Sequence, residues 1–73
     1  DCIKTLGGDM VSPAKIESLL MAEPEIAQAV AAGEGQPAIV AILVPAEGME
    51  GGLADAVKRV NARLSPFERV RRW

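Results

Sequence analysis

Few residues of this chain could carry chemistry, and most of them have a structural explanation. The 73 residues include no histidine, so His-dependent triads and the usual Cys/His zinc sites are excluded, and Ser12 has no histidine to activate it. Glu17, Glu23 and Glu25 could form a carboxylate pair, but they lie on or just after a predicted helix surface, which favours a solvated face. We therefore predict no metal site, and composition alone assigns no catalytic residue.

Two adjacent glycines, Gly7 and Gly8, are the remaining candidate for binding. Such a turn could cradle a phosphate, but the Walker lysine pattern and GxGxxG are both absent, so the signal is weak by itself. The glycines are equally compatible with simple closure of a hairpin. The single cysteine, Cys2, excludes an internal disulfide and fits a reducing compartment; we expect it to be a buried, inert thiol within an apolar strand.

Charge is divided unevenly along the chain. Residues 1–57 hold nine acids and two bases, a net charge of −7, whereas residues 58–73 hold six bases and one acid, a net charge of +5, which together give the total of −2. The basic end could attract phosphate or an acidic partner. The alternative is a solvated helix face that runs into a strand edge.

The glycine turn must be positioned by the elements around it, beginning with a hairpin and a helix. Residues 3–5 and 10–11 are predicted as its two strands. Ser12 is a good N-cap and Pro13 fits the first helical position, while Val11 and Ile16 occupy the two positions of a hydrophobic staple. The apolar spacing that follows indicates an amphipathic helix ending before residue 24.

The rest of the chain is predicted as a second hairpin, a loop, a second helix and the start of a last strand. Residues 25–32 and 38–44 are predicted as an antiparallel hairpin around a glycine turn, and the continuous apolar run in the second segment is typical of a strand covered on both faces. Residues 48–52 form a loop, and residues 53–64 an amphipathic helix with Lys58, Arg59 and Arg63 on its wetter side. Ser65 and Pro66 break this helix, and residues 67–73 look like the start of another strand.

The resulting order is β-β-α-β-β-α-β, with the last strand apparently truncated. Helices that cover a small mixed sheet define an α+β fold class. The only aromatic residues are Phe67 and Trp73, which argues against a stacking platform for nucleic acid. The longest apolar run, residues 37–45, is too short to cross a bilayer, so no transmembrane segment is predicted.

Several blocks together resemble one family. Residues 3–17 read IKTLGGDMVSPAKIE, and this block resembles the start of the C-terminal domain of AMP-forming acyl-CoA synthetases, which belong to the adenylate-forming superfamily with luciferases and peptide-synthetase adenylation domains. The similarity continues in PEIAQAV at residues 24–30. GEGQP at 33–37, AILVP at 41–45 and VNARLSPFERV at 60–70 look like the long-chain fatty acid branch.

The resemblance implies that residues 1–73 are the C-terminal lid domain of an AMP-dependent acyl-CoA ligase. Such enzymes join an acid to ATP, with Mg, to make an acyl-adenylate, and coenzyme A then attacks to give the thioester and AMP. The resemblance also implies an N-terminal adenylation domain in the same parent chain as partner, with fatty acid and coenzyme A as its other ligands. The small domain rotates about a hinge between an adenylation pose and a thioester-forming pose.

Carried over by position, Gly7 and Gly8 match the turn that meets the pantetheine arm in the coenzyme A channel. Asp1 falls just after the hinge, and the family's catalytic lysine is expected beyond Trp73, so no catalytic residue is assigned here. Lys4, Lys15 and Lys58 do not occupy its position. Three arginines could approach the coenzyme A phosphates, although no motif supports it: Arg69, Arg71 and Arg72.

The fragment alone is expected to lack activity and to hold no bound cofactor. The alternatives are the lid of an aryl-CoA ligase or of a peptide-synthetase adenylation domain, and a free-standing α+β interaction module whose basic end contacts an acidic partner. We expect a cytoplasmic parent enzyme, with any peripheral membrane contact made through its N-terminal domain.

Overall fold

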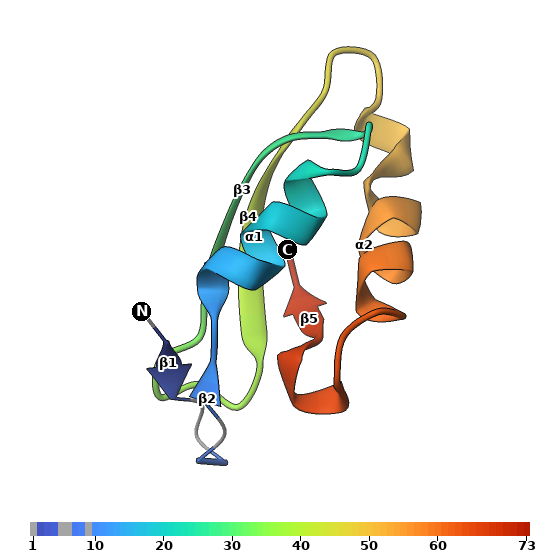
Figure 1. Ribbon diagram of the computed structural model, residues 1–73. Helices are drawn as coiled ribbons and strands as arrows, with labels where there is room; N and C mark the ends of the chain where they lie inside the picture. Colours follow the sequence, from blue (N-terminus) through green and yellow to red (C-terminus); the bar gives the residue numbers. More distant parts are fainter. Residues whose placement is uncertain (1, 5–6, 9) are drawn as a thin grey trace.

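A two-stranded sheet, a three-stranded sheet and two α-helices make up the part of the chain that the computed structural model describes, residues 2–4, 7–8 and 10–73 (Figure 1). The strands are β1 (Ile3–Lys4), β2 (Met10–Val11), β3 (Ile26–Ala32), β4 (Ile39–Pro45) and β5 (Val70–Arg72). The helices are α1 (Pro13–Met21) and α2 (Leu53–Asn61), with short 3-10 helices η1 (Glu50–Gly52) and η2 (Pro66–Glu68). The predicted β-β-α-β-β-α-β order and α+β class are confirmed.

The first hairpin and α1 follow the local signals of the sequence. β1 and β2 pair antiparallel, with Ile3 opposite Val11. Ser12 is the N-cap, and its hydroxyl accepts a hydrogen bond from the Lys15 amide at 3.3 Å, while proline occupies the start of the helix as predicted. Ile16 is fully buried. Thr5, Leu6 and Asp9, which belong to the predicted strand and turn, lie outside the described residues.

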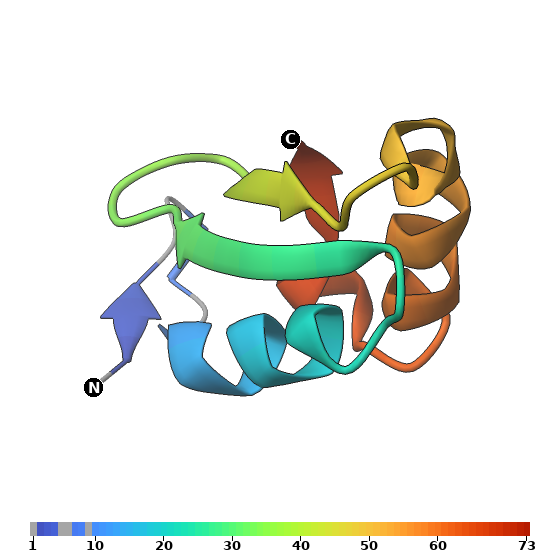
Figure 2. The same ribbon diagram turned by 90° about the horizontal axis from the view of Figure 1, so that it is seen from above.

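The three-stranded sheet is mixed, with strand order β3-β4-β5. β3 and β4 pair antiparallel, and β5 runs parallel to β4 with Ile39 opposite Val70. α1 lies along β3, and α2 lies next to α1 (Figures 1 and 2). One core forms between the helices and one face of this sheet, and its largest fully buried side chains are Val11, Ile16, Leu20, Ile39 and Val60.

The prediction that β4 is covered on both faces is wrong. Its residues alternate, because Ile39 and Ala41 are buried whereas Ile42 and Val44 are 70% and 50% exposed. Cross-strand pairing puts Val30, 53% exposed, opposite Ile42 on this same open face. The helices cover only the other face, so a continuous apolar run indicated strand but not two-sided burial.

The C-terminal part also differs from its prediction. α2 ends at Asn61, although Leu64 is still buried as the apolar spacing suggested. Phe67 lies in η2 and not in a strand, and β5 begins only at Val70. The sequence Ser65-Pro66-Phe67-Glu68 forms a capping box, in which Ser65 and Glu68 satisfy each other's backbone amides, and this turn delays the strand.

Cys2 is exposed, so the predicted buried thiol is also wrong. The residue precedes β1, and β1 pairs only with β2 in a sheet separate from β3-β4-β5. An apolar strand at the margin of a small domain does not bury the residue that leads into it.

The acidic residues of α1 and the turn after it are engaged in structure, not simply solvated. Arg59 of α2 donates from Nε to Glu23 at 2.7 Å and from Nη2 to Glu25 at 2.6 Å. The hydrogen bond from Arg59 holds the pKa of Glu25 below its usual value. Glu17 accepts from the Ala31 amide of β3 at 2.8 Å. The three carboxylates therefore fasten α1, β3 and α2 together.

Candidate functional site

A hollow at one end of the molecule brings together residues from three separate segments. It has a volume of about 120 Å³. The β1–β2 turn contributes Gly7, the β3–β4 loop contributes Pro37 and Ala38, and the region from η2 to β5 contributes the rest. That last group is Pro66, Phe67, Arg69 and Arg71. A wider hollow of about 320 Å³ shares Pro37, Ala38 and Arg71 with it and is also lined by Gln36, Val40 and Arg72.

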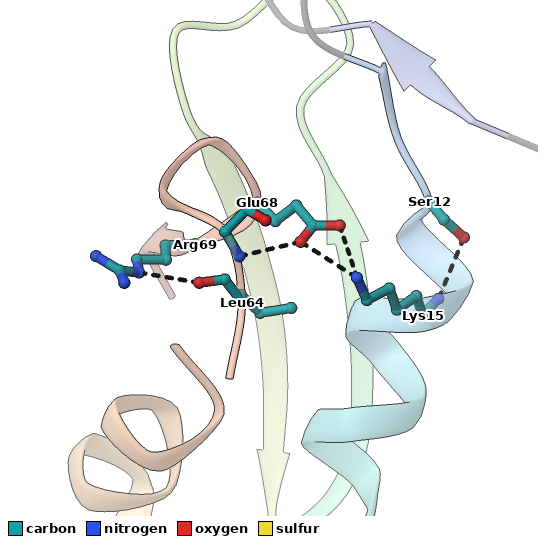
Figure 3. A network of polar contacts seen from close by, with 6 residues as sticks. Ser12, Lys15, Leu64, Glu68 and Arg69 are labelled. Atoms are coloured by element: carbon teal, nitrogen blue, oxygen red, sulfur yellow. Dashed lines mark hydrogen bonds and ion pairs between the residues drawn. The ribbon is translucent and has the colours of Figure 1, made fainter. Parts of the chain in front are cut away.

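Glu68 holds η2 in place from within the domain. Its carboxylate accepts from the Ser65 amide at 3.1 Å and from Lys15 Nζ at 3.0 and 3.2 Å (Figure 3). Glu68 is only 8% exposed, and the hydrogen bonds from Lys15 and then Ser65 hold its pKa below the usual value. A buried carboxylate with these partners fixes the turn that carries Pro66 and Phe67 against α1.

Asn61 and Arg69 fix the start of β5 against the end of α2. The Asn61 side chain donates from Nδ2 to the Val70 carbonyl at 2.9 Å and accepts from the Val70 amide at 2.8 Å. Arg69 Nε–H donates to the carbonyl oxygens of Asn61 at 3.1 Å and Leu64 at 3.3 Å. A guanidinium at the last carbonyls of a helix is favoured by the helix dipole.

Arg71 and Arg72 extend from this anchored strand, and both are exposed. Arg71 Nη2 donates to the Pro66 carbonyl at 3.5 Å, which is the outer limit for such a bond. A guanidinium carries five donors in a planar fork that matches the oxygens of a phosphate. The hollow therefore offers arginine donors, an apolar wall and an exposed aromatic ring, Phe67, which is 46% exposed. This arrangement can bind an anionic ligand that also carries an apolar or ring portion.

The two predicted glycines take different places. Gly7 lines the smaller hollow, whereas Gly8 is exposed, does not line it and has φ of +89°. A Cβ at Gly8 would meet no atom within 4 Å, so within this domain only the backbone conformation requires glycine there. That these glycines meet the pantetheine arm stays a prediction.

The sequence missed most of what builds this site. The S-x-x-E pattern of a capping box is present at Ser65 and Glu68, but locally Ser65 and Pro66 predict only the end of the preceding helix. Asn61 gave no signal, because its two bonds to Val70 depend on how β5 folds back beside α2. Of the three arginines, Arg69 and Arg71 line the smaller hollow, and Arg72 lines only the wider one.

Within the described residues, no group of three or more His, Cys, Asp or Glu side chains could hold a metal ion. Nor does that part of the chain contain a helix long and apolar enough to span a membrane.

The model of the family described as AMP-binding enzyme C-terminal domain matches residues 1–73. The chain belongs to this family. It is the C-terminal domain of an adenylate-forming enzyme. No curated protein matches the chain.

Solved structures agree with this assignment. A malonyl-CoA ligase, in a ternary product complex with methylmalonyl-CoA and AMP, is 39% identical over 99% of this chain, with a TM-score of 0.70. O-succinylbenzoate coenzyme A synthetase from Bacillus subtilis is 29% identical over 97% of it, with a TM-score of 0.69. The adenylation domain of a carboxylate reductase from Mycobacterium chelonae has the same fold, with a TM-score of 0.83 over 97% of this chain at 20% identity.

The chain spans only 16%, 14% and 13% of the length of these three structures, respectively. In these larger proteins the fold described here is therefore a small part.

Proposed function

We propose that this domain is the mobile lid of an ATP-dependent, AMP-forming fatty acid–CoA ligase, and that its arginine-lined hollow receives the phosphate-bearing part of coenzyme A. The parent enzyme takes ATP with Mg, a fatty acid and coenzyme A as substrates, and its N-terminal adenylation domain is the partner of this one. The enzyme works in the cytoplasm. The lid rotates between an adenylation pose and a thioester-forming pose.

One observation carries this proposal: the hollow puts Gly7 beside Arg69, Arg71 and Phe67. Coenzyme A joins a polyanionic nucleotide to a narrow pantetheine arm, and the hollow offers complementary groups for both. The guanidinium of Arg71 suits phosphate oxygens, and the Phe67 ring suits a base. In this proposal the turn that carries Gly7 faces the pantetheine arm.

Supporting evidence for a CoA ligase comes from the malonyl-CoA ligase, which shares 39% identity and was solved with an acyl-CoA product and AMP. The fatty acid is supported by the resemblance of residues 33–37, 41–45 and 60–70 to the long-chain branch. Acid choice belongs to the large domain, so a full-length substrate profile tests this part separately. If the enzyme prefers an aromatic acid, the proposed substrate is wrong, but the proposed function of the domain as a lid is unaffected.

The test uses the full-length ligase and Arg71→Gln, with Arg63→Gln as control. Arg63 is an exposed arginine after α2 that does not line either hollow, so its replacement makes the same charge change. Arg71→Gln should raise KM for coenzyme A roughly tenfold, the effect of one charge-assisted contact. KM for pantetheine, which has no nucleotide phosphates, and acid-dependent pyrophosphate exchange should both stay unchanged.

An unchanged KM for coenzyme A in Arg71→Gln would refute the phosphate-binding role. An equal rise for coenzyme A and pantetheine would assign Arg71 to the fold of the turn instead. The isolated 73-residue chain should release no pyrophosphate with any acid, and real turnover by the pure domain would contradict its role as a lid.

A further inference from the structure

The loop between β3 and β4 forms hydrogen bonds with both backbone groups of Lys4 in β1. The Lys4 amide donates to the Glu34 carboxylate, with 3.3 Å between nitrogen and Oε2. The Gly35 amide donates to the Lys4 carbonyl oxygen at 2.9 Å. Lys4 also pairs with Met10 of β2, so the strand leading into the glycine turn is held from two sides.

The same loop forms one wall of the hollow. Pro37 and Ala38 line it together with Gly7. At its start, Gly33 is buried, and a Cβ there would lie 2.9 Å from Ile39 Cδ1 and 3.4 Å from Ile3 Cδ1. The loop backbone therefore passes close to β1 before reaching the hollow. Its position and that of the glycine turn are set together.

We propose that Glu34 is a positioning residue for the thioester-forming step: with Gly35 it clasps Lys4 and so sets the Gly7 turn beside the arginine-lined hollow. The proposal rests on the proposed function, because it assigns the clasp to the site that takes coenzyme A. Glu34 acts through the hairpin backbone and not through contact with substrate.

Two variants separate positioning from charge. Glu34→Gln keeps a side-chain oxygen that can accept from the Lys4 amide but removes the negative charge, whereas Glu34→Ala removes both. If Glu34 acted only by its charge near a site for phosphates, both variants would lower KM for coenzyme A. If Glu34 acts by positioning, Glu34→Ala raises KM for coenzyme A, whereas Glu34→Gln has a KM close to that of the parent.

In the full-length ligase, Glu34→Ala should raise KM about two- to tenfold, the range of one net hydrogen bond. The rise should be equal for coenzyme A and pantetheine, because the displaced hairpin meets the arm that both molecules share. Pyrophosphate exchange should not change. Glu47→Ala is the matched control, since Glu47 is an exposed glutamate in the loop after β4.

Hydrogen exchange of the full-length protein provides a readout that does not depend on activity. Peptides covering residues 2–8 should exchange faster in Glu34→Ala, but not in Glu34→Gln or Glu47→Ala. Unchanged exchange together with an unchanged KM would overturn the clasp, as would a fall in KM in both Glu34 variants. The proposed function fails separately if Arg71→Gln has no effect on coenzyme A, and faster exchange in Glu34→Ala would still support the clasp.

Discussion

Gly33 offers a quantitative test of how the β3–β4 loop packs on the sheet. The residue does not require glycine by its φ, so alanine there is a purely steric change. The new Cβ would lie 2.9 Å from Ile39 Cδ1 and 3.2 Å from the Ala38 carbonyl oxygen. Carbon atoms in contact prefer about 3.5–4.0 Å, so the Ile39 methyl must move by roughly 0.6 Å or more.

Ile39 cannot move freely, because it is fully buried in the core. Overpacking of this kind costs about 1–3 kcal/mol, and we expect Gly33→Ala to destabilise the domain by this amount. Ile39→Val deletes the Cδ1 methyl that clashes, at an expected cost of about 0.5–1.5 kcal/mol by itself. In the double variant the methyl group that would be overpacked is absent. The double variant should therefore lose about 1 kcal/mol less stability than the sum of the losses in the two single variants.

The assay is urea denaturation of the 73-residue chain followed by far-UV circular dichroism, with the m-value unchanged across variants. Gly51→Ala is the control, because a Cβ at Gly51 meets nothing within 4 Å, and its stability should change by less than about 0.5 kcal/mol. Strict additivity in the double variant would refute the idea that Gly33 is required by its contact with Ile39.

Three further outcomes are expected. Gly8→Ala and Gly48→Ala both place alanine at positive φ in open space, and each should lower the free energy of unfolding by about 1–2 kcal/mol. In the full-length ligase, only Gly8→Ala should slow thioester formation relative to adenylation. The fold lowers the pKa of Glu68, so its carboxylate contributes fully to the free energy of unfolding above about pH 4.5, its ordinary pKa. This contribution is lost as the pH falls through the lower pKa of the folded state. The difference in unfolding free energy between the parent and Glu68→Gln should therefore become smaller as the pH is lowered. Ile42→Ala, on the open sheet face, should cost less than about 1 kcal/mol by thermal or urea unfolding, whereas Ile39→Ala should cost about 2–5 kcal/mol, and equal losses would show that both faces of β4 are buried in solution.

The elements that the sequence predicted well are those specified by local chemistry. Ser12, Pro13 and Ile16 lie within five consecutive residues, and each acts on the same helix start, so the beginning of α1 needed no tertiary information. The apolar spacing over α2 likewise predicted that Val57 and Val60 are buried, but it did not predict the burial of Ala56. Strand pairing within each hairpin followed from short glycine-containing connections.

Burial could not be predicted so well, because it depends on what lies opposite. The segment at Ile42 and Ile39 is uniformly apolar, yet the two side chains differ in exposure by 70% because the helices cover only one face. Glu23 and Glu25 looked solvated because their partner, Arg59, lies more than thirty residues away in sequence. Cys2 lies one residue before β1, so the apolar character of that strand does not predict the exposure of its side chain.

The candidate site is the extreme case of this dependence. Gly7, Pro37 and Arg71 are separated by about thirty residues in each interval, and no pattern in the chain links them. They meet because β5 runs parallel to β4 and starts beside Ile39, which puts Arg71 at the same end of the sheet as the β3–β4 loop. That loop in turn holds β1 through Lys4.

The hollow therefore depends on hydrogen bonds made by three residues outside its lining: Glu68 for η2, Asn61 for β5 and Glu34 for the hairpin. If the proposed function holds, replacing any one of these three residues should alter KM for coenzyme A, although none of them lines the hollow. A site that depended on its lining residues alone would show no such change.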